Sequence, residues 1–202
     1  MNAPRQRILQ PVAGIPAPEI GLFLAQMDDQ SRRLTEDTRG ATVDELAWQP
    51  RAGMNTIGML LAHNAIVEVF WISHAAVIPC DCPGVLGIGV DDDGMPIPED
   101  GLPPGTLAGK DIAWFDDLRA RARAFTYDWA RRWTAKDLDR TITRQRADGE
   151  WTMNVRWILY HVLEHEAGHY GQVNLIRHQH RAAAAMAAGP RMATLAPHGA
   201  AG

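Results

Sequence analysis

Apolar residues recur every three or four positions in long stretches of the chain, a spacing that places side chains on one face of an α-helix. The pattern predicts four amphipathic helices, over about residues 17–39, 55–78, 109–133 and 153–184. Helices of this length with one apolar face bury it best against one another. The sequence therefore predicts an all-α fold, an antiparallel four-helix bundle.

The connections carry their own signals. Thr42–Glu45 has the pattern of a capping box and predicts a short helix, closed at Trp48-Gln-Pro50. Residues 79–107, between the second and third helices, are rich in Pro, Gly and Asp, and this loop is longer than most helix connections. Residues 141–151 alternate around a turn at Asp148-Gly149, which predicts a short hairpin, and Thr152 is expected to cap the last helix.

The chain has 202 residues, 46% of them hydrophobic, which suits one domain with a substantial core. We assign a flexible N-terminal segment to 1–16, the bundle domain to 17–184 and a low-complexity tail to 185–202. A net charge of −4 with mixed signs gives no reason to expect nucleic acid. No long apolar run or signal-peptide core occurs, so we expect a cytoplasmic protein with a small-molecule substrate, no membrane contact and a homodimer left open. The preference for Arg over Lys suggests a bacterial source.

Histidines fall on the apolar stripes of two helices. His161, His165 and His169 are spaced four apart, so they share one helix face. One stripe comprises Val155, Ile158, Val162, His165, His169, Gln172 and Ile176; the other comprises Thr56, Leu60, His63, Val67, Phe70, His74 and Val77. Burying several imidazoles together without a metal ion costs desolvation. We therefore expect His63, His165 and His169 to bind one divalent metal ion.

A competing interpretation is a zinc protease, because His165-Glu166-Ala167-Gly168-His169 is an HExxH sequence in which the glutamate acts as general base. Such enzymes need a third ligand, usually downstream. No Asp or Glu follows Glu166, and only His178, His180 and His198 remain there. Because its position turns Glu166 off the apolar stripe, we expect it on a solvated helix face and rank the protease interpretation below the two-helix site.

These residues carry a resemblance to the DinB/YfiT-like superfamily of four-helix metal-binding proteins. It covers about residues 17–181 and rests on Trp48-x-Pro50, on Leu61-Ala-His63 followed by Glu68 and Trp71, and on His165-x-x-x-His169-x-Gly171-Gln172. The resemblance implies that His63, His165 and His169 hold a divalent metal, and that the protein is similar to transferases and isomerases that use mycothiol, bacillithiol or glutathione. The 79–107 loop departs from compact members.

Three neutral imidazoles leave at least one position of a metal ion open, as in catalytic zinc sites. Zinc is the first expectation, with nickel, iron or manganese as alternatives. Glu68 and His161 lie about one helical turn from ligand positions, so we predict them as catalytic proton shuttles or as partners of an imidazole N–H. The favoured function is a thiol-dependent S-transferase or isomerase. The alternatives are a metal-water hydrolase, an Fe(II)-dependent oxidative enzyme, or a non-catalytic stress-associated binding module.

The 79–107 loop contains a pair of cysteines and a run of three aspartates. Cys80 and Cys82 are too close in sequence for an easy disulfide and are expected as free thiols. Asp91-Asp92-Asp93-Gly94 starts like a calcium loop, but Gly89 would occupy the first ligand position, so we interpret it as a solvated acidic turn.

Overall fold

The computed structural model describes residues 8–188 and confirms the helical bundle. Its long helices are α1 Pro18–Thr38, α3 Ile57–Ala76, α5 Ile112–Ala130 and α6 Val155–Ala187, each within a few residues of the predicted bounds. Residues 1–7 and 189–202, the outer parts of the predicted flexible segment and tail, lie outside the described residues. Within residues 8–16, the Val12 N–H donates to the Gly21 carbonyl at 3.1 Å, so this stretch contacts the start of α1.

Short polar side chains fix where the helices begin. Thr56 accepts from the Met59 N–H at the start of α3, and Asn154 accepts from the Trp157 N–H at the start of α6. The predicted cap at Thr152 is therefore wrong. Thr152 belongs to a strand and pairs with Thr143, so the cap lies two residues beyond it, at Asn154, and the helix begins at Val155.

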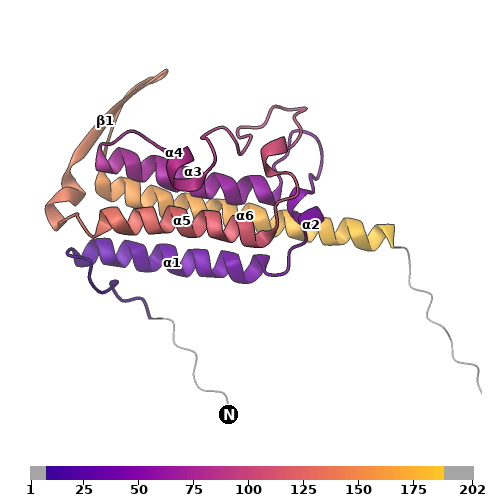
Figure 1. Cartoon of the computed structure of the whole chain (residues 1–202), viewed down its shortest axis with the longest axis horizontal. Coiled ribbons are helices and arrows are strands. Elements are labelled where there is room, and N and C mark those ends of the chain that lie inside the picture. Colours follow the sequence, from indigo (N-terminus) through magenta and orange to yellow (C-terminus); the bar gives the residue numbers. More distant parts are fainter. Residues whose placement is uncertain (1–7, 189–202) are drawn as a thin grey trace, which may run out of the picture.

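Side-chain pairs establish the helix directions. In α3 and α5, Gly58 faces Phe115 and Glu68 contacts Arg123, so these two helices are parallel. By contrast, α3 and α6 are antiparallel, as are α1 and α5. Figure 1 shows the same arrangement, with α3 and α5 both running back from the end that carries α2. The bundle is thus not a simple up-and-down array.

This arrangement explains the length of the 79–107 segment. Two consecutive parallel helices require a connection that returns along the whole of α3, roughly 30 Å for a helix of this length. The returning segment, which we call the crossover, includes the short helix α4 Cys82–Leu86 and a 3-10 turn, η1 Gly105–Leu107. It is therefore not a bare loop, and it runs along α3, with α4 packed against α3 and α5 (Figure 1).

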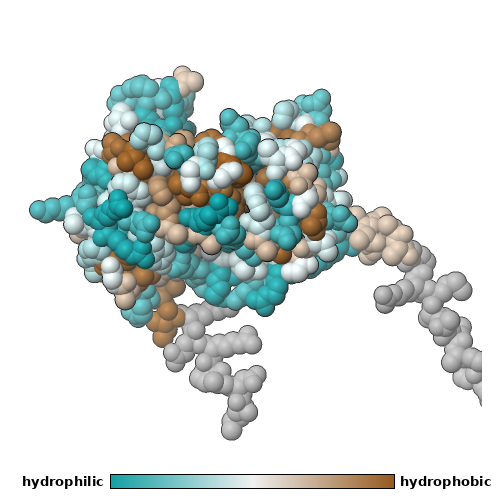
Figure 2. Space-filling view, viewed as in Figure 1, coloured by the Kyte–Doolittle hydropathy of each residue, from teal (hydrophilic) through white to brown (hydrophobic). Residues whose placement is uncertain are grey.

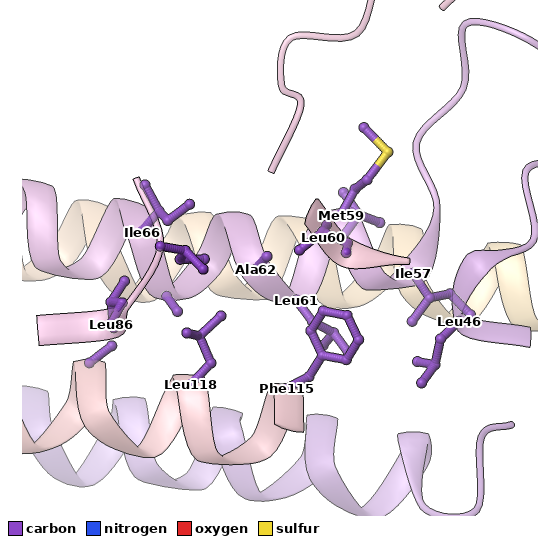
Figure 3. Packing of buried hydrophobic residues seen from close by; sticks show 14 of the residues in the cluster. Leu46, Ile57, Met59, Leu60, Leu61, Ala62, Ile66, Leu86, Phe115 and Leu118 are labelled. Atoms are coloured by element: carbon purple, nitrogen blue, oxygen red, sulfur yellow. The ribbon is translucent and has the colours of Figure 1, made fainter. Parts of the chain in front are cut away.

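Buried side chains form two adjoining clusters along the bundle. In the first, the apolar residues of α3 pack against α2, Val43–Ala47, and against α4 and α5. Figure 3 shows Leu86 of α4 lying between Ile66 and Leu118, which anchors the crossover at one point. The second cluster joins α1, α6 and η2 Ala135–Asp139 at the other end. Helix α3 is consequently buried on most sides.

Among the described residues, only α3 is long and apolar enough to cross a membrane, and 78% of that stretch is buried inside the protein. The face of the bundle shown in Figure 2 carries many hydrophilic residues, with apolar patches across the middle at the level of α4. The composition of α3 therefore reflects its central position in the core.

The predicted hairpin is confirmed. Strands β1 Thr141–Arg146 and β2 Gly149–Asn154 are antiparallel, with Thr141 opposite Asn154 and Arg146 opposite Gly149. The hairpin projects from the end of the bundle opposite α2 (Figure 1). On the bundle side, the Arg144 guanidinium lies over the rings of Phe70 and Trp71, 4.8 and 5.5 Å from their centroids.

Candidate metal centre

Three histidines from two helices meet at the seam between α3 and α6. One nitrogen from each of His63, His165 and His169 lies within 4.8 Å of the other two. The ring centroids of His63 lie 5.0 Å from His165 and 5.1 Å from His169, and those of His165 and His169 are 4.4 Å apart. The structure thus brings together the three residues predicted from the two stripes.

The stripes are less buried than the sequence suggested. His63, His165 and His169 are half-buried, the His63 side chain is 21% exposed, and Val77 at the end of its stripe is 69% exposed. The reason is that α3 turns its most apolar sides toward α2, α4 and α5, so the histidines lie at the rim of the core. A ligand can reach this position from solvent.

His63 is oriented by a residue of the crossover that the sequence analysis did not select. Its Nδ1 lies 2.8 Å from Asp93 Oδ2, and Asp93 is only 1% exposed. The other carboxylate oxygen accepts from the Met95 N–H at 2.9 Å. The interpretation of Asp91–Gly94 as a solvated turn is therefore wrong for Asp93. A carboxylate on Nδ1 holds the proton there and leaves Nε2 as the ligand atom.

His169 is oriented in the same way, because its Nδ1 lies 2.9 Å from Gln172 Oε1. Its Nε2 lies 3.3 Å from Nε2 of His165. Two imidazole nitrogens that share a tetrahedral zinc ion at the usual bond length are also about 3.3 Å apart. The donor set and its spacing therefore fit a divalent ion of this kind.

The surroundings of the cluster favour the neutral form of its imidazoles. Burial, together with the neighbouring His169, His63 and His161, lowers the pKa of His165 to about 3, and burial also lowers the pKa of His169. Both imidazoles are thus neutral near pH 7, which is the form that binds metal.

A small cavity of about 10 Å³ lies beside His165 and is also lined by the Asn64 side chain. Neither the nitrogen nor the oxygen of the Asn64 amide has a hydrogen-bond partner among the described residues.

Glu166 is placed away from solvent, and its predicted position on a solvated face is wrong. It is 6% exposed, accepts from Ser31 Oγ at 2.7 Å, and lies 3.4 Å from Arg123 and 3.6 Å from Arg119. Burial raises its pKa, while Arg123 acts in the opposite direction. One residue along a helix turns the side chain by about 100°, which here aims Glu166 at α1 and α5. The protease interpretation lacks its general base.

Glu68 lies in the same buried ion-pair network. Its Oε1 accepts from Arg123 Nε at 2.8 Å and from Thr126 Oγ1 at 2.6 Å, and its Oε2 accepts from Arg123 Nη2 at 3.3 Å. Arg123 also contacts Asp28 at 2.8 Å. Both oxygens of Glu68 therefore accept hydrogen bonds from side chains of α5.

His161 lies beside the histidine cluster on α6. Its ring stacks on Trp157 with centroids 4.7 Å apart, meets Trp71 edge-on at 5.0 Å, and lies 5.7 Å from the ring of His165. Its Nδ1 lies 3.0 Å from Glu164. His161 thus continues the row of imidazoles toward the aromatic side chains at the hairpin end.

The two cysteines are free, as expected. Their sulfur atoms are 3.3 Å apart at the start of α4, and burial raises the pKa of Cys82 to about 12. Neither belongs to the histidine cluster.

Comparison with known proteins places the chain in a family. Residues 26–173 match the DinB superfamily. No curated protein matches the chain. The crystal structure of a conserved protein from Enterococcus faecalis has a similar fold, with a TM-score of 0.59 at 16% sequence identity, covering 78% of this chain and 94% of that one. From its fold, its three-histidine cluster and this sequence match, the protein belongs to the DinB superfamily.

Proposed function

We propose that the protein is a metal-dependent enzyme that transfers a low-molecular-weight thiol to a small electrophile, or isomerises the electrophile through such an adduct. The observation that carries the proposal is the three-imidazole cluster, with its ligand atoms within 4.8 Å of one another and His63 partly exposed to solvent. A divalent ion with open positions supplies the charge that lowers the pKa of a bound thiol or water. Zinc suits the donor set best.

The roles of the protein's own residues follow from their contacts. Asp93 and Gln172 hold the Nδ1 protons of His63 and His169, which fixes both rings with Nε2 toward the site. We assign proton transfer to His161, because its ring is 5.7 Å from His165 and its side chain is 21% exposed. Glu68 we assign to the ion-pair network that holds α3 to α5.

The reaction balances without an external oxidant or reductant. The thiol loses its proton, its sulfur forms a bond to the electrophilic carbon, and the leaving group departs with the electron pair of the broken bond. The thiol proton passes through His161 to the leaving group or to solvent. In an isomerisation the same sulfur adds to the substrate and is then eliminated, which regenerates the thiol.

A cobalt-substituted protein tests the proposal. Glutathione, mycothiol and bacillithiol should be added in turn, and at least one is expected to produce the near-ultraviolet band of cobalt–sulfur ligation, absent in His165→Ala. A conjugation assay with the same thiol should then show turnover. If no thiol changes the cobalt spectrum, the hydrolytic, oxidative and non-catalytic alternatives replace the thiol-transfer proposal.

A further inference from the structure

A pocket of about 430 Å³ lies beside the histidine cluster. Its walls come from three separate segments: Gly53–Asn55 before α3, Met95–Ile97 of the crossover, and Gln172, Leu175 and Ile176 of α6. We call it the crossover pocket, because residues 95–97 close one side of it. Its volume lies within the range of small-molecule sites.

The pocket shares residues with the network that orients the metal ligands. Gln172 lines it and accepts from His169 Nδ1. Met95 lines it as well, and its N–H donates to the Asp93 carboxylate that contacts His63. A molecule in the crossover pocket would therefore be separated from His169 by Gln172 alone, and from His63 by Met95 and Asp93.

The chemistry of the walls selects among ligands. Among the residues that the structure describes, no charged side chain lines the pocket, and its polar side chains are the amides of Asn55 and Gln172. The remaining side chains are apolar, including the flexible thioethers of Met54 and Met95, which adapt to irregular apolar shapes. A charged molecule would lose hydration here without gaining an ion pair.

The wall formed by Gly53–Asn55 is fixed to the crossover. Gly53 adopts a φ of +77°, and its N–H donates to the Gly101 carbonyl at 3.0 Å. The Gln49 amide donates to the carbonyls of both Met54 and Gly101, at 2.8 and 3.0 Å. A Cβ at position 53 would lie 1.9 Å from the Glu99 carbonyl oxygen, so only glycine permits this approach. The pocket is thus formed before any ligand arrives.

We infer that the crossover pocket binds the electrophilic substrate, and that this substrate is an uncharged, mainly apolar molecule. The inference rests on the proposed thiol transfer and adds the class of its second reactant. The thiol and the electrophile then occupy different places, with the thiol at the cluster and the electrophile against Met54, Met95 and Leu175.

Two fluorescent probes with the same ring system test the selectivity of the pocket. N-phenyl-1-naphthylamine is uncharged, and 1-anilinonaphthalene-8-sulfonate carries a sulfonate. With the full zinc-loaded protein, we expect the uncharged probe to bind at least tenfold more tightly. Leu175→Arg, at a position 55% exposed and therefore tolerant of a long side chain, should weaken that binding at least tenfold. Leu102→Arg, on the crossover but outside the pocket and 76% exposed, should not.

Gly53→Ala is a second variant, which displaces the wall without adding charge and should likewise weaken binding of the uncharged probe. Its helical circular dichroism signal reports whether the bundle remains folded. The inference is overturned if the sulfonated probe binds as tightly as the uncharged one, or if Leu175→Arg leaves the affinity for the uncharged probe unchanged. The two proposals fail separately. Probe binding that depends on Leu175 in a protein whose cobalt spectrum ignores every thiol would retain the apolar site and refute thiol transfer.

Discussion

The contact between Asp93 and His63 makes a quantitative prediction about metal affinity. In Asp93→Asn, Oδ1 can still accept from the Met95 N–H, but an amide NH₂ replaces the oxygen that lies 2.8 Å from His63 Nδ1. An amide NH₂ is a donor, so Nδ1 of His63 would have to act as an acceptor. The imidazole ring would then carry its proton on Nε2 instead. That tautomer cannot bind metal through Nε2.

Loss of such an orienting partner typically lowers metal affinity about 10- to 100-fold, which corresponds to roughly 1.4–2.7 kcal/mol of binding free energy. We expect Asp93→Asn to fall in this range. The assay is competition for zinc against a chromophoric chelator at pH 7, with circular dichroism to verify that the bundle is folded.

Asp91→Asn is the matched control, because it removes the same charge from the same turn, at an exposed position away from His63. Its affinity should stay close to that of the unmodified protein. Equal affinities for Asp93→Asn and the unmodified protein would refute the orienting role. Equal losses in both variants would assign the effect to long-range charge.

Three further predictions concern stability. Removing the metal should leave the helical signal intact and lower the melting temperature only modestly, because the core clusters are built without it; collapse of the signal would indicate a structural ion. The metal-free protein should lose stability as pH falls from about 6.5 toward 3. The reason is that the lowered pKa of His165 in the folded protein lets the unfolded chain bind the proton at a higher pH. Urea unfolding of His165→Asn should show a smaller dependence of stability on pH, and an equal dependence would contradict this prediction. Arg123→Met should cost about 3–5 kcal/mol, because it removes the ion-pair partner of buried Glu68 and leaves Glu166 with Arg119 alone. Arg131→Met, in an exposed pair, should cost at most about 1 kcal/mol, and similar urea midpoints for the two variants would refute the difference.

The features that the sequence predicted well are those encoded by local periodicity. The four long helices and the His63, His165 and His169 cluster follow from spacings of three and four, and the hairpin follows from alternation around Asp148-Gly149. Family resemblance supported the same cluster from its motifs.

The features that it missed depend on packing between distant segments. Asp93 meets a histidine 30 positions earlier only because the crossover returns over α3, and nothing in its neighbouring residues signals that path. Likewise, spacing places Glu166 off the histidine stripe but does not reveal that α1 and α5 cover that side of the helix.

The central claim is that His63, His165 and His169 bind one divalent ion. Elemental analysis of protein purified without chelators or affinity metals tests it most directly. We predict one ion per chain, its loss in each single alanine variant of the three histidines, and its retention in His178→Ala, which alters an exposed histidine on the same helix. Full metal content in His63→Ala would contradict the account, because the site would then not span α3 and α6.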